Sequence, residues 1–263
     1  MSYEWLPEET ADHLREWGLN VREHLGWQGR AKYGPQERHY TPRGIINHHT
    51  AGTNWYPPTR LYESCQLYID PAGVVHVIAA GYNPSSGMGD PKVLNAILRS
   101  EPVPPPQDRN AVDRIDGNSW FVNIEVGHWG LGQPIPAAQR DALIGLNAAL
   151  CELLGFDVED IIGHLEWTLR KIDPNWEWDG ARDTMDAIRA DTESRRLEGV
   201  EPDMKPWKPG VEDPTYEPFK WELFELHGHK LTSGNSTLLL SQCSRLTNSA
   251  RTPLSRISSW CKS

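Results

Sequence analysis

Two short segments of the sequence carry side chains that could do chemistry together. The segment IINHHTAG, residues 45–52, places two histidines side by side after an apolar run. The segment GHLEWTLRKIDP, residues 163–174, supplies a histidine, a lysine and an aspartate. Neighbouring side chains of a β-strand point to opposite faces, so only one of His48 and His49 can face a given site.

These residue types match the ligands that a catalytic zinc ion uses. Such an ion takes three nitrogen, oxygen or sulfur ligands from the protein and leaves its fourth position for a water molecule. That water ionises near neutral pH and becomes a nucleophile. His48, His164 and Asp173 would provide two imidazoles and one carboxylate. A histidine and an aspartate at this spacing are also common as surface or structural groups, so the spacing alone leaves both interpretations open.

The segments around these residues predict β-strands. Residues 43–50 (RGIINHHT) contain an apolar run that predicts a buried strand, and residues 120–126 (WFVNIEV) are rich in β-branched and aromatic side chains. Residues 65–80 predict a β-hairpin with its turn at residues 71–73. The Pro-rich residues 100–110 predict a long surface loop.

Helices are expected between and after these strands. The clearest one opens near Pro136, carries an apolar stripe and ends at Gly155. Others are expected at about residues 7–17 and 181–197. Strands interleaved with helices predict an α/β body that ends near residue 200. The apolar stripe consists of Leu143, Leu146, Leu150 and Leu153.

Composition divides the chain into three regions. Residues 1–198 are expected to form the folded body, and residues 199–218 a semi-rigid linker, because their five prolines resist regular structure. Residues 219–263 carry six Lys or Arg and two Glu, a net charge of +4, and are rich in Ser and Thr. This last region predicts either a small binding module or a poorly ordered tail.

Charge and composition argue against several classes of protein. The net charge of −10 argues against a nucleic-acid binder, and no apolar run reaches membrane-spanning length. The acidic start of the sequence lacks the features of a signal peptide, so we expect the protein to be made and folded in a cytoplasm. The four cysteines form no CxxC pair and are expected to be reduced thiols.

The order of three motifs resembles a known superfamily of enzymes. HHTAG, then NIEV, then GHLEWTLRKIDP is similar to the zinc N-acetylmuramoyl-L-alanine amidases of the type-2 amidase and peptidoglycan-recognition superfamily. The flanking segments look most like endolysins of phages that infect actinobacteria. The resemblance covers about residues 4–195 and does not extend to the last 45 residues. It implies a mixed central β-sheet flanked by helices.

The resemblance also implies a role for five residues. Carried over position by position, His48, His164 and Asp173 are the zinc ligands. Glu125 in VNIEV matches the acidic residue near the zinc, and its expected role is general base. Lys171 matches the lysine that stabilises the oxyanion of the tetrahedral intermediate. A buried carboxylate on a strand could instead be a paired structural group.

The sequence also carries expectations for other positions near these motifs. His49 is expected to point to the opposite face, for packing or a supporting hydrogen bond. Some relatives carry a catalytic tyrosine at the position of Cys65, so this chain fits better with the branch that uses the glutamate. Four side chains flank the site in sequence and are candidates for substrate contact, with core packing or plain exposure as the alternative: Trp55, His128, Trp129 and Trp167.

The expected function is that of a phage endolysin. Such an enzyme hydrolyses the amide between N-acetylmuramic acid and L-alanine in peptidoglycan, and stays in the host cytoplasm until it is released onto the wall. We expect a zinc-dependent monomer with no nucleic-acid partner and no stable membrane association, whose basic tail could hold the wall. Three alternatives stay open: a non-catalytic peptidoglycan-recognition module, a zinc peptidase that cuts within the stem peptide, and a bacterial amidase for wall recycling or remodelling.

Overall fold

The computed structural model describes residues 5–33, 38–52, 64–106, 114–178, 180 and 184–200. All of them belong to one of the two units into which the chain divides, Met1–Asp203. The predicted basic segment, almost all of the predicted linker and the candidate Trp55 therefore lie outside the described residues.

The described part of the chain is built on a six-stranded sheet. Its strands are β1 (Val21–Glu23), β2 (Gly44–His49), β3 (Leu67–Ile69), β4 (Val75–Val77), β7 (Phe121–Val126) and β8 (Ile161–Gly163). Their order in the sheet is β1-β4-β3-β7-β2-β8. Only the pairing of β3 with β4 is antiparallel. The sheet is therefore mixed, and the predicted α/β fold is confirmed.

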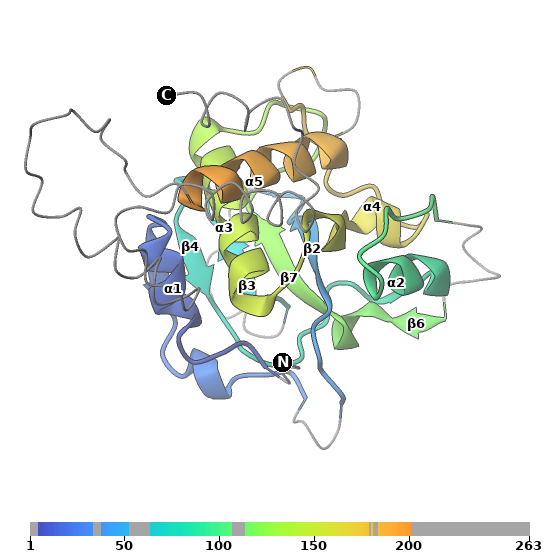
Figure 1. The fold of residues 1–263 in the computed structure, drawn as a ribbon, viewed down its shortest axis with the longest axis horizontal. Coiled ribbons are helices and arrows are strands. Elements are labelled where there is room, and N and C mark those ends of the chain that lie inside the picture. The colour runs from blue at the N-terminus through green and yellow to red at the C-terminus, as the bar shows by residue number, and fades with distance from the viewer. Residues whose placement is uncertain are drawn as a thin grey trace, which may run out of the picture. The chain divides into compact units, whose positions relative to one another are not determined.

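Helices pack on both faces of this sheet. α1 (Thr10–Glu16), α3 (Ala137–Leu154) and α5 (Thr184–Val200) share one apolar core with it, whereas α2 (Pro91–Ile97) and α4 (His164–Trp167) share another. Figure 1 shows α3 and α5 crossing in front of the strands, with α2 and α4 to one side. None of the described helices is long and apolar enough to cross a membrane.

Shorter elements complete the described part of the chain. Two-residue strands pair antiparallel to form a second sheet, and three single turns of 3-10 helix connect larger elements. They are β5 (Met88–Gly89), β6 (Ile115–Asp116), η1 (Trp27–Gly29), η3 (Gly117–Ser119) and η4 (Val158–Asp160).

Side-chain alternation along β2 assigns its residues to the two cores. Ile45 packs in the core that contains α3, and Ile46 packs in the core that contains α2 and α4. By the same alternation, His48 lies on the face of Ile46 and His49 on the face of Ile45. β7 runs parallel to β2 with Glu125 opposite His48, so these two side chains share one face.

Most of the predicted elements are confirmed. β2 and β7 occupy the two predicted strands, and β3 and β4 form the predicted hairpin, whose turn is held by backbone N–H groups that donate to the Asp70 carboxylate. α3 ends at Gly155, whose φ of 72° is left-handed. α2 was not predicted, although the Asp90 carboxylate caps its first turn and Pro91 occupies its first position.

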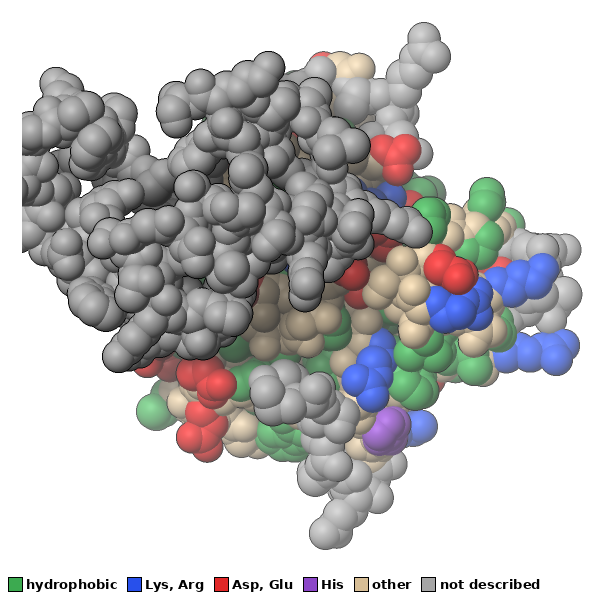
Figure 2. Space-filling view, viewed as in Figure 1, with side chains coloured by type: hydrophobic (Ala, Val, Ile, Leu, Met, Phe, Trp, Pro, Cys, Tyr) green, Lys and Arg blue, Asp and Glu red, His purple; other side chains and the backbone are tan. Residues whose placement is uncertain are grey.

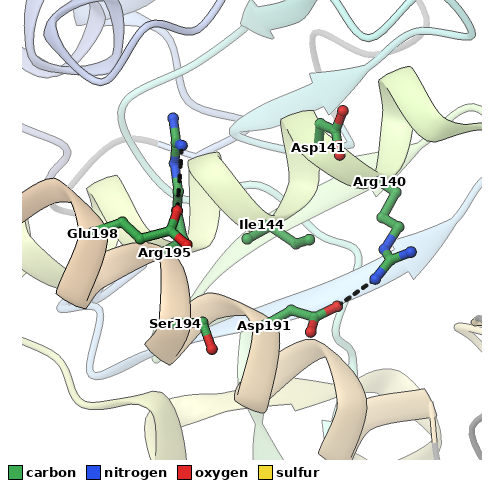
Figure 3. A pocket seen from close by; sticks show the side chains of 7 residues that line it. All are labelled: Arg140, Asp141, Ile144, Asp191, Ser194, Arg195 and Glu198. Carbon is green, nitrogen blue, oxygen red and sulfur yellow. Dashed lines mark hydrogen bonds and ion pairs between the residues drawn. The ribbon is translucent and has the colours of Figure 1, made fainter.

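A polar groove of about 590 Å³ lies between α3 and α5. Figure 3 shows two ion pairs in it, Arg140 with Asp191 and Arg195 with Glu198. The groove belongs to the helical layer and not to the sheet face that carries His48. On the face presented in Figure 2, described Lys and Arg side chains gather on the side of α2, with acidic side chains among them, so no continuous basic surface forms there.

A buried histidine pair lies at the β1 edge of the sheet. His24 directly follows β1, and its Nε2 atom lies 3.0 Å from Nδ1 of His76. The Nε2 atom of His76 lies 3.2 Å from a carboxylate oxygen of Asp70. Burial lowers the pKa of His24 to about 4, and the charges of His76 and Arg30 act in the same direction. His24 is therefore neutral in the folded protein near pH 7.

The free energy of unfolding should fall as the pH drops from about 6.5 to about 4. In this window the unfolded chain binds a proton at His24 that the folded protein does not bind, so acid favours unfolding. The effect is on the order of 2 kcal/mol. The free energy of unfolding, measured with urea at several pH values between about 4 and 7, should depend less on pH in His24→Gln than in the unmutated protein. Equal slopes would assign the acid sensitivity to other groups.

Candidate metal centre

Three side chains converge at one edge of the sheet. Nδ1 of His48 lies 2.9 Å from Nδ1 of His164, and each of these nitrogens lies 3.0 Å from Oδ2 of Asp173. Both histidines are 2% exposed and Asp173 is 8% exposed. The three residues predicted as zinc ligands are thus brought together in a largely buried cluster, and Asp173 is the most exposed of them.

The parallel pairing of β2 and β8 explains how the two histidines meet. Asn47 lies opposite Gly163 in the register of this pair, so His48 and His164 follow at the same level of the sheet. His164 is the first residue of α4, and Asp173 lies in the loop after that helix. The N–H group of Leu165 donates to the Asp173 carbonyl oxygen over 2.7 Å, which returns the loop to the start of the helix.

The geometry of the cluster fits a small cation. A tetrahedral zinc ion with bonds of about 2.0–2.1 Å needs ligand atoms roughly 3.3 Å apart, close to the separations of 2.9–3.0 Å among these three atoms. The other ring nitrogens are already engaged, since Nε2 of His48 contacts Oδ1 of Asn123 and Nε2 of His164 contacts the Ser86 carbonyl oxygen. Within the described part of the chain, no second group of three such residues gathers its ligand atoms this closely.

The electrostatics of the cluster favour positive charge at its centre. Burial opposes ionisation of Asp173, but hydrogen bonds with His164 and His48 outweigh it and hold the pKa of Asp173 well below its usual range. Burial also opposes protonation of His48, yet Asp173 and the charge of Glu125 raise the pKa of His48 above its ordinary value. For His164, burial and the charge of His48 dominate and lower the pKa to about 4. An anionic carboxylate beside two imidazoles draws in a cation.

Glu125 lies beside this cluster, as predicted. It is opposite His48 in the parallel pairing of β2 and β7 and is 8% exposed. Its Oε1 atom accepts a hydrogen bond of 3.0 Å from the Ser85 hydroxyl. Burial raises the pKa of Glu125 above its ordinary value of 4.5, while the charge of His48 opposes this rise. A carboxylate with a raised pKa next to a candidate metal centre can exchange protons in the working pH range.

Lys171 stands at the exposed rim of the site. Its side chain is exposed to solvent, and it precedes Asp173 by two residues. Burial is the main influence on the pKa of Glu125 and raises it, whereas the positive charge of Lys171 lowers this pKa. The charge of Lys171 is therefore felt at Glu125, and its role toward an oxyanion stays a prediction.

His49 supports the site from the opposite face of β2, where packing or a hydrogen bond was predicted. Its Nδ1 atom accepts a hydrogen bond of 3.2 Å from the N–H group of Asn175. A Cβ atom built on Gly130 would lie 2.1–2.3 Å from three atoms of the His49 ring, so glycine allows the backbone to pack directly on that ring. The Asn175 side chain also donates to the Gly130 carbonyl oxygen over 3.0 Å. His49 therefore joins β2 to the two loops beside the cluster.

The candidates for substrate contact divide into exposed and buried residues. Trp129 is 52% exposed, so its ring is free of the packed interior. Trp167 is fully buried, with its ring centre 5.1 Å from that of Phe121, and His128 is 6% exposed and engaged with the Gly130 N–H group. Trp167 is therefore packed in the interior, the alternative that the sequence also allowed. Substrate contact by His128 and Trp129 stays a prediction.

Several residues of the site were not predicted. Asn123 contacts His48, and Ser86 contacts His164, both from the buried interior. A sequence signal for Asn123 existed, because it precedes Glu125 by two residues in a strand and must share its face. Ser86 follows no regular period and offers no such signal. Cys65 is buried, and burial together with the charge of Glu125 raises the pKa of its thiol.

Fold and site together define an α/β protein with a two-histidine, one-carboxylate cluster at the edge of a mixed sheet and the buried carboxylate of Glu125 beside it. The family model described as N-acetylmuramoyl-L-alanine amidase matches residues 38–176, more than half of the chain, and the protein belongs to this family. The matched span contains His48, Glu125, His164 and Asp173. The class of enzyme is therefore that of amide hydrolases that act on peptidoglycan.

Solved structures of similar proteins have low identity to this chain. The endolysin N-acetylmuramoyl-L-alanine amidase LysCS from Clostridium intestinale URNW shares 16% identity with a TM-score of 0.38, covering 66% of this chain and 95% of that chain. The amidase LysC from the same organism shares 16% with a TM-score of 0.37, covering 66% and 97%. The catalytic domain of XlyA shares 15% with a TM-score of 0.40, covering 66% and 99%. No curated protein matches the sequence.

Proposed function

We propose that the protein is a zinc-dependent N-acetylmuramoyl-L-alanine amidase of the endolysin type, from a phage that infects actinobacteria. The observation that carries the zinc site is the convergence of three buried ligand atoms within 3.0 Å of one another. Both histidines engage their other ring nitrogen with an oxygen of the protein, as ligands of a metal commonly do. Family membership supports the substrate bond, and the similarity of the sequence motifs supports the phage origin.

Each residue of the site has its own role in the proposed amide hydrolysis. Zinc bound by His48, His164 and Asp173 would polarise the scissile carbonyl and lower the pKa of a bound water. Glu125 accepts the proton of the attacking water and passes it to the nitrogen of L-alanine as the carbon–nitrogen bond breaks. Its raised pKa suits both transfers. Lys171 stabilises the negative charge on the former carbonyl oxygen, and Trp129 offers an exposed ring to the substrate.

Product analysis tests this function. Purified actinobacterial peptidoglycan should be digested with zinc-loaded protein and the fragments identified by mass spectrometry. Free stem peptides that begin with L-alanine, together with intact glycan chains, are the expected products. Cuts within the stem peptide would make the protein a zinc peptidase. Binding to the wall without any cleavage would make it a recognition module.

We also propose that the basic segment, residues 219–263, binds the cell wall. Residues 1–198 form the catalytic domain and residues 199–218 the linker, and the enzyme waits in the host cytoplasm until it is released. Six Lys or Arg in the basic segment can attract an anionic cell wall. Replacing all six by Gln should reduce pelleting of the protein with cell walls several-fold at low salt. Unchanged pelleting would remove this role from the segment.

A further inference from the structure

The nitrogens of His48 and His164 that point away from the cluster are held by one buried network. Nε2 of His48 lies 3.2 Å from Oδ1 of Asn123, and Nε2 of His164 lies 2.9 Å from the Ser86 carbonyl oxygen. The Ser86 hydroxyl also donates to Oδ1 of Asn123 over 2.5 Å. Asn123 is 0% exposed and Ser86 is 1% exposed. Ser86 therefore connects the supports of both histidines.

Backbone groups fix which way the Asn123 amide points. Its Nδ2 atom lies 3.3 Å from the Asn83 carbonyl oxygen and 3.4 Å from the Phe121 carbonyl oxygen. A backbone carbonyl can only accept a hydrogen bond, so the NH₂ end of the amide must lie on that side. The oxygen end is therefore the one that faces His48 and Ser86, and the orientation does not depend on any proton placed by choice.

Gln66 extends the network and is fixed in the same way. Its Nε2 atom donates to the Gly81 carbonyl oxygen over 2.7 Å, and its Oε1 atom accepts from the backbone N–H group of Asn123 over 2.8 Å. One end of the Gln66 amide thus meets a backbone acceptor and the other a backbone donor, which excludes a flip. Oε1 of Gln66 also accepts from Nδ2 of Asn123 over 3.0 Å. The buried side-chain amides of Gln66 and Asn123 thus form a chain of hydrogen bonds that leads to His48, each in a fixed orientation.

The orientation of these groups decides where the ring protons lie. Oδ1 of Asn123 and the Ser86 carbonyl oxygen are acceptors, so Nε2 of His48 and Nε2 of His164 must each carry a proton. For a neutral imidazole the lone pair is then on Nδ1, the atom that faces Asp173 in both cases. We propose that Gln66, Asn123 and Ser86 are positioning residues that fix the protonated Nε2 of both histidines and so preset Nδ1 as the atom that binds zinc. This inference rests on the zinc site of the proposed function.

A matched pair of substitutions at Asn123 isolates this role. Asn123→Leu and Asn123→Asp both lose the hydrogen bonds that the NH₂ group donates to Gln66, Asn83 and Phe121. Only Asn123→Asp keeps an acceptor for Nε2 of His48 and for the Ser86 hydroxyl. Zinc affinity, measured by competition with a chelator, should fall about 10- to 100-fold in Asn123→Leu. It should stay within about threefold of the unmutated protein, or rise, in Asn123→Asp.

Nitrogen-15 NMR of the histidine rings reads the proton positions directly. In the zinc-free unmutated protein, the Nε2 chemical shifts of His48 and His164 should be those of protonated nitrogens. The Ser86→Ala variant keeps the backbone carbonyl that accepts from His164, so the His164 chemical shifts should be unchanged in it. In Asn123→Leu the His48 signals should change while those of His164 stay. If Nε2 of His48 is unprotonated in the unmutated protein, or if both Asn123 variants lose zinc equally, the inference is wrong. If the unmutated protein binds no zinc but both Nε2 atoms are protonated, the zinc site fails and the positioning role stands.

Discussion

Replacing Asp173 by alanine is expected to abolish both zinc binding and peptidoglycan hydrolysis. Asp173 is the one anionic member of the cluster, and its Oδ2 atom lies 3.0 Å from both histidine nitrogens. Without it the site keeps two neutral ligands, too few for a catalytic zinc ion. Because the metal contributes several kcal/mol to stabilisation of the transition state, hydrolysis should fall by about three orders of magnitude or more.

The measurement combines metal content and product release. Zinc per protein chain is determined after dialysis, and the release of stem peptides from peptidoglycan is followed by mass spectrometry. Asp12→Ala is the matched control, because that carboxylate belongs to a surface ion pair with Arg15 and its side chain is 81% exposed. A variant Asp173→Ala that hydrolyses peptidoglycan at the rate of Asp12→Ala would exclude Asp173 from the active site.

The choice between His48 and His49 shows how far the sequence leads. Strand periodicity alone established that only one of them can face a site, and the resemblance to the amidases selected His48. In the structure the same alternation places Ile46 and His48 on one face, where β7 brings Glu125 alongside. A period of two along a strand is a local property, so it could be predicted without knowing which strands are neighbours.

The residues that hydrogen-bond to His48 and His164 from behind the cluster are brought there by contacts between distant parts of the chain, which the sequence does not predict. Ser86 and His164 are 78 residues apart in the chain, and Gln66 and Asn123 are 57 apart. The hydrogen bond between Gln66 and Asn123 exists because the strand order places β3, which directly follows Gln66, beside β7. No periodicity along the chain encodes that order, so Gln66 and Ser86 could not be selected from the sequence, whereas the period of two along the strand does place Asn123 on the face of Glu125.

Trp167 shows why nearness in sequence to His164 could not decide between substrate contact and core packing, the two alternatives that the sequence left open. It follows the ligand His164 by three residues in the one-turn helix α4. That turn directs its ring inward against Phe121, and a Cβ atom built on Gly89 would lie 2.1 Å from the ring. Burial of the indole thus anchors α4, and with it His164, to the second core.

Replacement of Glu125 by glutamine should reduce the turnover rate about 10²- to 10⁴-fold, the usual contribution of general acid–base catalysis. Glutamine keeps the volume of the side chain and an oxygen that can accept the hydrogen bond from Ser85, but it cannot accept the proton of the attacking water. Glu125 is not one of the three converging ligands, so zinc content should stay unchanged. Glu101→Gln, whose carboxylate pairs with Arg99 and whose side chain is 53% exposed, is the matched control.

The pH dependence separates a general base from a structural carboxylate. A base works in its ionised form, so activity falls as the pH drops through the pKa of Glu125, which burial has raised above 4.5. The acid limb of the turnover rate in the unmutated protein should therefore follow the titration of Glu125. It should disappear in Glu125→Gln over the pH range in which zinc stays bound. Because protonation of the histidine ligands also releases zinc at low pH, metal content must be measured at each point. An acid limb that persists in Glu125→Gln with zinc fully bound would transfer the role of base to another group.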